Sequence, residues 1–297
     1  MSSPSRLEIL QPDTLAEALE LRTANPDAVA LAGGTDLMVA LNFDRARPPS
    51  VLDLTRVEGL REWAPDGDRV RVGAGVTYTR LIEELGNRLP GLAIASRSVG
   101  SLQIRNRGTV GGNLGTASPA GDGLPPLYTS DAVVEVASPR GTRRVPVAEF
   151  ITGPRRNALA PDELITAFEL APASGPQQFA KVGTRNAMVI AVCSLSLALW
   201  PEERRIATCI GSAGPTPLPA AAADDFVAGV LDEHDYWTTR APLPDVALQR
   251  FGELVGQAAR PIDDVRGTAD YRRHAIGVLA RRTLGWAWTR WTEPPWD

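Results

Sequence analysis

Residues 104–122 read IRNRGTVGGNLGTASPAGD, and they concentrate glycine, alanine and hydroxyl or amide side chains without any hydrophobic period. A stretch this long without periodicity inside a compact chain usually has a function. Because Gly111 and Gly112 lack a β-carbon, their backbone amides can approach a phosphate closely and form an anion-binding nest. We therefore expect residues 108–123 to form a glycine-dense loop that binds a phosphate group.

A second glycine pair lies near the N-terminus, in the segment AGGTD at residues 32–36. The apolar residues 28–31 before it predict a short strand, and a helix is expected to begin at Asp36. Thr35 adds a hydroxyl donor, and the positive end of that helix would favour a nearby phosphate. The pair could equally be an ordinary strand-to-helix turn. The geometry suits a pyrophosphate.

The composition of the 297-residue chain excludes several classes of protein. Apolar residues at 43% and charged residues at 22% are typical of a globular protein with one large or two ordinary domains. A net charge of −4 without a basic stripe argues against nucleic-acid binding. Residues 186–200 form an apolar, uncharged run of fifteen residues, which is shorter than the roughly 20 apolar residues of a membrane span. Residues 1–11 lack an apolar signal core, so we expect a cytoplasmic protein without a membrane span.

Few side chains of this sequence can bind a metal or an iron–sulfur cluster. The two cysteines, Cys193 and Cys209, are too few for a cluster, and His234 and His274 have no partner at ligand spacing. A nicotinamide fingerprint is also missing, because residues 108–112 lack the spaced glycine triad and the segment GAG at 73–75 is followed by Tyr78 where the third glycine should stand. If the chain performs redox chemistry, a bound organic cofactor has to carry it.

Strand and helix signals alternate along the chain, which predicts an α+β fold in two domains. The segment APASGP at residues 171–176 consists of turn-forming residues and predicts the boundary. We expect an N-terminal domain over residues 1–172, with subdomains at about 1–55 and 56–172, and a C-terminal domain over residues 177–285. The predicted elements include a helix over 14–22 capped by Asp13, strands over 164–170 and 187–199, and helices near 221–230, 246–259 and 270–284.

Residues 286–297 are predicted to be a tryptophan-rich tail. This end of the chain contains Trp286, Trp288, Trp291 and Trp296 beside Arg281, Arg282 and Arg290. Tryptophan with arginine is typical of the residues that dominate protein–protein contacts. The alternative is that these rings pack back onto the core.

Five segments, in this order, resemble the FAD-binding subunit of the xanthine dehydrogenase and aerobic carbon monoxide dehydrogenase group of molybdenum hydroxylases. They are AGGTD at 32–36, residues 104–113 with 117–119 and Asp122, FITGPRR at 150–156 with 163–165, FAKVGTR at 179–185, and GPTP at 214–217. The resemblance implies a VAO/PCMH-like FAD-binding domain of two subdomains, followed by a smaller α+β flavoprotein domain.

The resemblance also implies which residues bind FAD. Those that would surround the pyrophosphate and its neighbouring ribityl and ribose groups are Leu31, Ala32, Gly33, Gly34, Thr35, Asp36, Leu37, Thr109, Gly111, Gly112 and Asn113. Asp122 would accept hydrogen bonds from sugar hydroxyls, or alternatively cap a helix beginning near Gly123.

Two further residues would lie beside the flavin ring. Ile165 would pack near it, and Lys181 would place a cation near the N1 and C2-carbonyl end of the ring, where it stabilises the reduced flavin. Lys181 could alternatively be a solvated strand residue. An aromatic ring that some members of the family place against the flavin aligns near Val99, so that ring is absent here.

The implied function is electron transfer through FAD. The partners would be a [2Fe-2S] small subunit that delivers electrons and a molybdopterin-binding large subunit that oxidises the substrate, with an external acceptor reoxidising the flavin. Because the cofactor performs this chemistry, no catalytic acid, base or nucleophile is expected from this chain. The alternatives are a free-standing FAD-dependent oxidoreductase and a flavin-free scaffold or regulator of the same fold.

Overall fold

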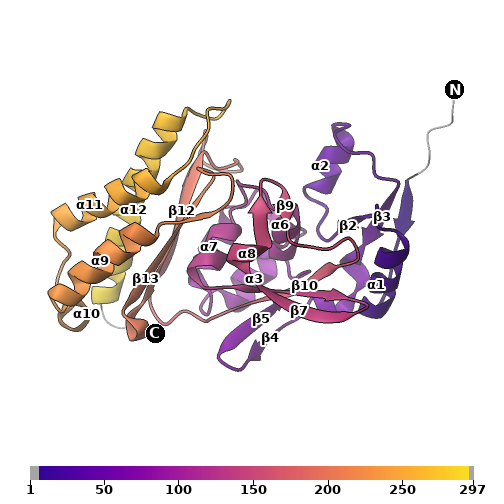
Figure 1. Ribbon diagram of the computed structural model, residues 1–297, viewed down its shortest axis with the longest axis horizontal. Coiled ribbons are helices and arrows are strands. Elements are labelled where there is room, and N and C mark those ends of the chain that lie inside the picture. Colours follow the sequence, from indigo (N-terminus) through magenta and orange to yellow (C-terminus); the bar gives the residue numbers. More distant parts are fainter. Residues whose placement is uncertain (1–6, 294–297) are drawn as a thin grey trace.

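The computed structural model describes residues 7–293, and its sheets follow one another along the long axis of the molecule (Figure 1). A small parallel sheet lies at one end, an antiparallel sheet with its helices lies in the middle, and a second antiparallel sheet covered by long helices lies at the other end. No helix within residues 7–293 combines the length and the hydrophobicity of a membrane span.

The small sheet has strand order β1-β3-β2 and is parallel throughout. Its helix α1 begins one residue later than predicted, because Thr14 caps it by accepting a hydrogen bond from the amide of Glu17 at 3.2 Å. The predicted cap, Asp13, is wrong: its backbone amide instead donates to the Glu17 carboxylate. The elements are β1 (Glu8–Leu10), α1 (Leu15–Ala24), β2 (Val29–Leu31), α2 (Leu37–Asn42) and β3 (Ser50–Asp53), followed by the 3₁₀ turns η1 (Leu54–Arg56) and η2 (Glu58–Leu60).

The middle sheet has strand order β4-β5-β10-β6-β7 and buries one continuous apolar core under its helices. All seven residues of β10 are buried, including Thr166 and Glu169, which interrupt its apolar sequence. Its strands are β4 (Trp63–Asp66), β5 (Arg69–Gly73), β6 (Val133–Ser138), β7 (Gly141–Pro146) and β10 (Leu164–Leu170), with the hairpin β8 (Ile151–Gly153) and β9 (Arg156–Asn157). The helices are α3 (Tyr78–Leu85), α4 (Pro90–Arg97), α5 (Leu102–Arg105), α6 (Val110–Thr116), α7 (Leu124–Thr129) and α8 (Val147–Phe150).

The stretch predicted as a glycine-dense loop contains a helix, α6. Three glycines in seven residues give it a poor intrinsic helix propensity, so the sequence pattern conceals it. Packing supplies the missing stability, because Val110 and Leu114 are completely buried in the middle core. Thr109 caps the helix by accepting a hydrogen bond from the amide of Gly112 at 2.8 Å.

The C-terminal sheet has strand order β11-β12-β13-β14 and is covered on both faces. Helices α9 and α12 pack on one face and helices α4 and α7 of the middle layer pack on the other, so every residue of β12 is buried. The strand predicted over 187–199 begins only at Cys193, because residues 184–190 form a mostly exposed loop and the buried residues Ala191 and Val192 lie outside the strand. The elements are β11 (Gln177–Val182), β12 (Cys193–Trp200), η3 (Pro201–Glu203), β13 (Arg205–Gly211), β14 (Leu218–Pro219), α9 (Ala221–Glu233), α10 (Tyr236–Thr239), α11 (Asp245–Ala258) and α12 (Ala269–Thr292).

The tryptophan-rich segment begins inside a helix rather than after one, because α12 continues to Thr292. Trp288 is buried against Trp237 in an edge-to-face contact and donates a hydrogen bond to the carbonyl of Ala241 at 2.8 Å. The guanidinium of Arg240 lies over the ring of Trp291. Two of the rings therefore anchor α12 to the core, Trp286 is half exposed, and Trp296 lies outside the described residues.

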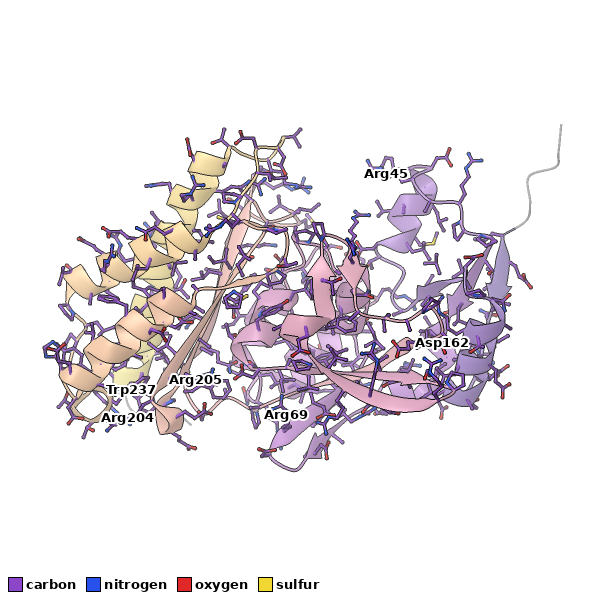
Figure 2. All side chains as sticks on the ribbon, viewed as in Figure 1. Arg45, Arg69, Asp162, Arg204, Arg205 and Trp237 are labelled. Carbon is purple, nitrogen blue, oxygen red and sulfur yellow. The ribbon has the colours of Figure 1, made fainter. Side chains whose placement is uncertain are left out.

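Arginines join the middle layer to the C-terminal sheet along one edge of the molecule. Arg205 of β13 donates to the carboxylate of Asp131 at 2.8 Å, and Arg69 of β5 donates to the carbonyl of the same residue at 2.7 Å. Figure 2 labels Arg69 and Arg205 in the lower half of the view, where the middle layer meets the C-terminal sheet. The turn at Asp131 thus links the two layers by charge-assisted hydrogen bonds.

Asp224 has a half-buried side chain with one carboxylate oxygen shielded from solvent, and it makes the stability of the fold depend on pH. Burial raises the pKa of its carboxyl group to about 7. The hydrogen bonds from Thr208 lower this pKa, but burial is the larger effect. The folded state therefore binds the proton more tightly than the unfolded chain, and the free energy of unfolding falls as the pH rises from about 4 to 7. We predict that Asp224→Asn raises the free energy of unfolding at pH 8 by roughly 1–3 kcal/mol.

Urea denaturation at pH 4 and pH 8 measures this effect. The gain should largely disappear at the lower pH, where Asp224 is protonated in the folded protein and about half protonated in the unfolded chain. Glu233→Gln, at the exposed end of the same helix, is the control and should leave the pH dependence unchanged. An equal gain for Asp224→Asn at both pH values would contradict the prediction.

Candidate functional site

The two glycine loops are in direct backbone contact. A β-carbon built on Gly33 would lie 1.9 Å from the carbonyl oxygen of Arg107 and 2.8 Å from the Cα of Gly108. A β-carbon on Gly111 would lie 2.4 Å from the carbonyl oxygen of Ala74. Only glycine fits at either position, so Gly33 joins the first loop to the second and Gly111 joins the second loop to the end of β5.

A pocket of about 220 Å³ opens between these loops. Ten of the fourteen predicted binding residues line it, and the structure therefore brings together segments that are far apart in the sequence. They are Leu31, Ala32, Gly33, Gly34, Thr35, Asp36, Leu37, Thr109, Gly112 and Asn113. Tyr78, Val99, Ile104 and Thr116 also line the pocket.

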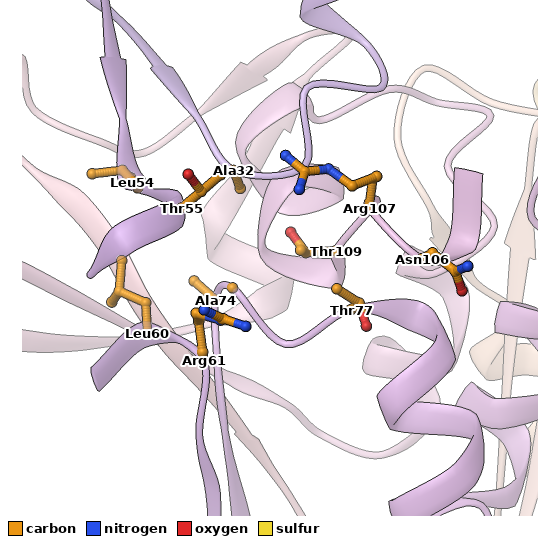
Figure 3. A pocket seen from close by; sticks show the side chains of 11 residues that line it. Ala32, Leu54, Thr55, Leu60, Arg61, Ala74, Thr77, Asn106, Arg107 and Thr109 are labelled. Carbon is orange, nitrogen blue, oxygen red and sulfur yellow. The ribbon is translucent and has the colours of Figure 1, made fainter. Parts of the chain in front are cut away.

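A second pocket, of about 230 Å³, lies next to the first and shares Ala32 and Thr109 with it. Figure 3 shows the side chains of Arg107 and Thr55 beside Ala32, and that of Arg61 near Ala74. Sequence reasoning missed these three residues as site residues. Arg107 stands inside the quoted glycine motif, but Thr55 and Arg61 stand in 3₁₀ turns and loops that carry no motif.

Hydrogen bonds hold the pocket in shape. Gly34 has a φ of +75°, a left-handed conformation that favours glycine and lets the first loop turn into α2. The hydroxyl of Thr116 donates to the Asp36 carboxylate at 3.0 Å, which ties the first loop to α6. The side-chain oxygen of Asn113 accepts a hydrogen bond from the amide of Gly123 at 3.2 Å, which fixes the turn that contains Asp122.

Asp122 and Lys181 form a buried ion pair across the two domains. The Lys181 ammonium donates to the Asp122 carboxylate at 2.6 Å, and their side chains are only 13% and 8% exposed. The same ammonium donates to the carbonyls of Ser98 and Val189, and the hydroxyl of Ser98 donates to the carboxylate. Burial raises the pKa of the Asp122 carboxyl group, and the charge of Lys181 opposes this shift.

The ion pair overturns two alternatives from the sequence. Lys181 is not a solvated strand residue, because its ammonium is enclosed by a carboxylate and two carbonyls. Asp122 does not cap α7, because the residue before that helix is Gly123 and no side chain caps it. Within residues 7–293, the second carboxylate oxygen of Asp122 has no hydrogen-bond partner.

Gly111 and Ile165 lie beneath the pocket rather than in its wall. Ile165 is buried in the middle core, and its Cδ1 lies 3.7 Å from the position of a β-carbon on Gly115 of α6. These two residues, with Asp122 and Lys181, are the four predicted site residues that do not line the pocket. They support the elements that line it, and direct contact with a cofactor stays a prediction.

Comparison with known proteins identifies the family and the fold. A family model described as the FAD binding domain in molybdopterin dehydrogenase matches residues 5–173, and one described as the CO dehydrogenase flavoprotein C-terminal domain matches residues 178–287. The chain belongs to this flavoprotein family. The family resemblance and the α+β fold predicted from the sequence are therefore confirmed.

Individual relatives cover almost the whole chain. The putative xanthine dehydrogenase FAD-binding subunit XdhB of Escherichia coli (strain K12) is 33% identical, with 91% of this chain and 92% of the relative covered. The nicotinate dehydrogenase FAD-subunit of Eubacterium barkeri is also 33% identical, over 75% of this chain and 79% of the relative. A solved carbon monoxide dehydrogenase chain from Hydrogenophaga pseudoflava superimposes with a TM-score of 0.87 at 27% identity, covering 97% of this chain and 99% of that one.

We predict that Gly33→Ala separates the two loops. The added methyl group overlaps the Arg107 carbonyl, so the variant should lose about 1–3 kcal/mol of unfolding free energy and most of its affinity for FAD. Thermal unfolding and FAD titration measure the two effects. Gly59→Ala is the matched control, because no atom lies within 4 Å of its added β-carbon, and equal behaviour of the two variants would refute the prediction.

We predict that Lys181→Met destabilises the protein by roughly 3–5 kcal/mol, because it leaves the Asp122 carboxylate buried without a counter-charge. Asp122→Asn combined with Lys181→Met should recover most of this loss, which a double-mutant cycle by urea denaturation measures. Arg250→Met breaks the exposed pair with Glu253 and should cost less than about 1 kcal/mol. Additive effects of the Asp122 and Lys181 substitutions would show that the pair is not coupled.

Proposed function

We propose that this chain is the FAD-binding subunit of a molybdenum hydroxylase-type complex and that it passes electrons from iron–sulfur clusters to an external acceptor. The observation that carries the proposal is the contact of the two glycine loops around one pocket. The pocket wall consists mainly of backbone and small side chains. Such a wall suits a diphosphate, which is recognised by amides and hydroxyls at close range.

The residues present fit FAD in three respects. The two pockets meet at Ala32 and Thr109, so a dinucleotide can extend through both with its diphosphate at the shared wall. Arg61 and Arg107 line the second pocket and supply positive charge beside that wall. The unpartnered oxygen of Asp122 is a buried acceptor that a sugar hydroxyl of the cofactor would satisfy.

The position of each residue relative to the pocket indicates the role we propose for it. Residues 31–37 with Thr109, Gly112 and Asn113 would hold the diphosphate and the sugar groups next to it, while Gly111 and Ile165 would support α6 from below. Lys181 and Asp122 would orient the flavin end, because Ser98, which both contact, precedes the pocket residue Val99. Bound FAD supplies the electron-transfer chemistry, and the protein binds it and excludes water.

The proposed partners are a [2Fe-2S] small subunit and a molybdopterin-binding large subunit. Relatives are named as FAD-binding subunits of dehydrogenases or as the medium subunit of a hydroxylase, which favours this proposal over a free-standing FAD oxidoreductase. A flavin-free scaffold is disfavoured because both loops keep the glycines that leave the pocket open. The domain limits at 172 and 177 and a cytoplasmic location stay predictions.

We predict that the purified chain is yellow and releases close to one FAD per chain. Gly34→Asp should abolish loading, because it puts a side chain and a negative charge where the phosphate binds, and Gly111→Asp should do the same by displacing α6 from Ala74. Absorbance of the released flavin measures the loading. Gly229→Asp, at an open position of α9, is the charge-matched control and should load normally.

A colourless chain that ignores added FAD would show that the chain is a flavin-free member of the fold. Gel filtration of the protein from its native source tests the partners. A hydroxylase component should co-elute with other chains and with molybdenum, whereas a free-standing oxidoreductase should elute alone with its flavin.

A further inference from the structure

A third pocket, of about 490 Å³, lies where helix α4 of the middle layer meets the C-terminal sheet and the end of α12. Its walls come from α4 and the turn before it, from the start of β11, and from the last two turns of α12. It shares no lining residue with the two pockets between the glycine loops. Small-molecule sites occur preferentially at such junctions between layers or domains. We call this cavity the α4–α12 pocket.

The side chain of Gln177 brings an unused hydrogen-bond donor to the α4–α12 pocket. Gln177 is the first residue of β11, lines the pocket and is only 5% exposed. Its side-chain oxygen accepts a hydrogen bond from the backbone amide of Gly91 at 3.1 Å, which fixes the orientation of the side chain, because a reversed amide would place two donors face to face. Within residues 7–293, the amide nitrogen has no hydrogen-bond partner. Since a buried donor without a partner is costly, this nitrogen points to an acceptor that a ligand supplies.

The α12 side of the pocket supplies an aromatic ring and a cation. Trp286 lines the pocket and is 51% exposed, whereas Trp288 is buried in the core. Arg290 follows Trp286 by four residues on the same helix, so the two side chains lie on one face of it. A half-exposed indole offers a flat surface on which another ring can stack, and a guanidinium matches the geometry of a carboxylate.

The charges of the pocket limit the kind of ligand. Arg290 and Glu293 are the charged side chains that line it, and Glu293 stands at the C-cap of α12. Among residues 7–293, neither of them forms an ion pair. Because their charges cancel, the wall has no net charge and does not suit a polyanion such as a nucleotide. A single carboxylate that meets both Arg290 and the Gln177 amide fits these charges.

We propose that the α4–α12 pocket binds a small aromatic carboxylate, with its ring on Trp286 and its carboxylate accepting hydrogen bonds from the Gln177 amide and the Arg290 guanidinium. The site is separate from the pockets between the glycine loops, and the proposal does not rest on the proposed function. A ligand in this position contacts both α4 and α12. It therefore stabilises the packing of the middle layer against the C-terminal domain.

Isothermal titration calorimetry of the full chain, as purified, tests the proposal with two probes. The first is 2-naphthoate, and the second is 2-naphthamide, which has the same ring and no charge. Trp286→Ala should weaken the binding of both probes by about tenfold, because both stack on the indole. Arg290→Gln should weaken 2-naphthoate by about threefold to tenfold and leave 2-naphthamide unchanged, because only the carboxylate pairs with the guanidinium.

Matched controls lie on the same helix outside the pocket. Tyr271→Ala removes an aromatic side chain that is 49% exposed, and Arg282→Gln removes an exposed guanidinium. Both variants should bind the two probes like the unsubstituted chain. Glu293→Gln should strengthen 2-naphthoate binding by about twofold to threefold, because it removes a like charge from the wall.

Gln177→Glu tests the unused donor directly. It keeps an oxygen that accepts from Gly91 and replaces the unpartnered nitrogen by a second acceptor, so binding of 2-naphthoate should be lost. Thermal unfolding shows whether this variant folds, and the Trp286 and Arg290 variants decide the matter if it does not. In the unsubstituted chain, 2-naphthoate should raise the midpoint of thermal unfolding.

Four outcomes would overturn the proposal and leave the proposed function intact. The first is that neither probe binds at millimolar concentration. The second is that Trp286→Ala binds both probes as tightly as Tyr271→Ala does. The third is that Arg290→Gln weakens 2-naphthamide as much as 2-naphthoate. The fourth is that FAD and 2-naphthoate compete, which would place the probe between the glycine loops. Failure of the chain to hold FAD would instead refute the proposed function.

Discussion

The close approach of the Gly33 backbone to the Arg107 carbonyl is the contact on which the site depends. It presses the loop after β2 against the loop before α6, and these loops belong to different sheets. A side chain at Gly33 would separate the sheets as well as the loops. The contact also explains why the helix α6 can be so rich in glycine: its stability comes from the surfaces that its buried residues and Gly111 meet on either side.

The C-terminal sheet positions the part of the site that contains Lys181. Strand β12 is buried on both faces, and β11 beside it carries Lys181. The position of the Lys181 ammonium is therefore set by a rigid sheet and is satisfied by groups from the middle layer, Asp122 and Ser98. Since a buried charge without these partners is costly, the sheet and the middle layer are held in one relative orientation. That orientation brings the loop before β12 next to residues 97–104.

Sequence patterns predicted the elements whose hydrophobic pattern is clear. They failed where tertiary packing overrides the intrinsic helix or strand preference of the residues. The largely apolar segment 164–170 predicts β10, and that strand is buried throughout. Helix α6 was missed because glycine suppresses the helical signal, and the Asp122–Lys181 pair was missed because it joins residues 59 positions apart. The glycine pairs pointed to a shared pocket, but only the structure separates pocket-lining Gly112 from buried Gly111.

The first pocket contains little that could act as an acid or base of its own. Its titratable side chains are Asp36, which accepts a hydrogen bond from Thr116, and Tyr78. Burial, with the nearby negative charges of Asp122 and Asp36, raises the pKa of the Tyr78 hydroxyl, so this group stays neutral and acts only as a polar wall. Such a pocket offers amides, hydroxyls and shape. Because the glycines leave room for a ligand close to the backbone, the shape of the pocket determines which ligand binds. The reactive chemistry has to come from the cofactor.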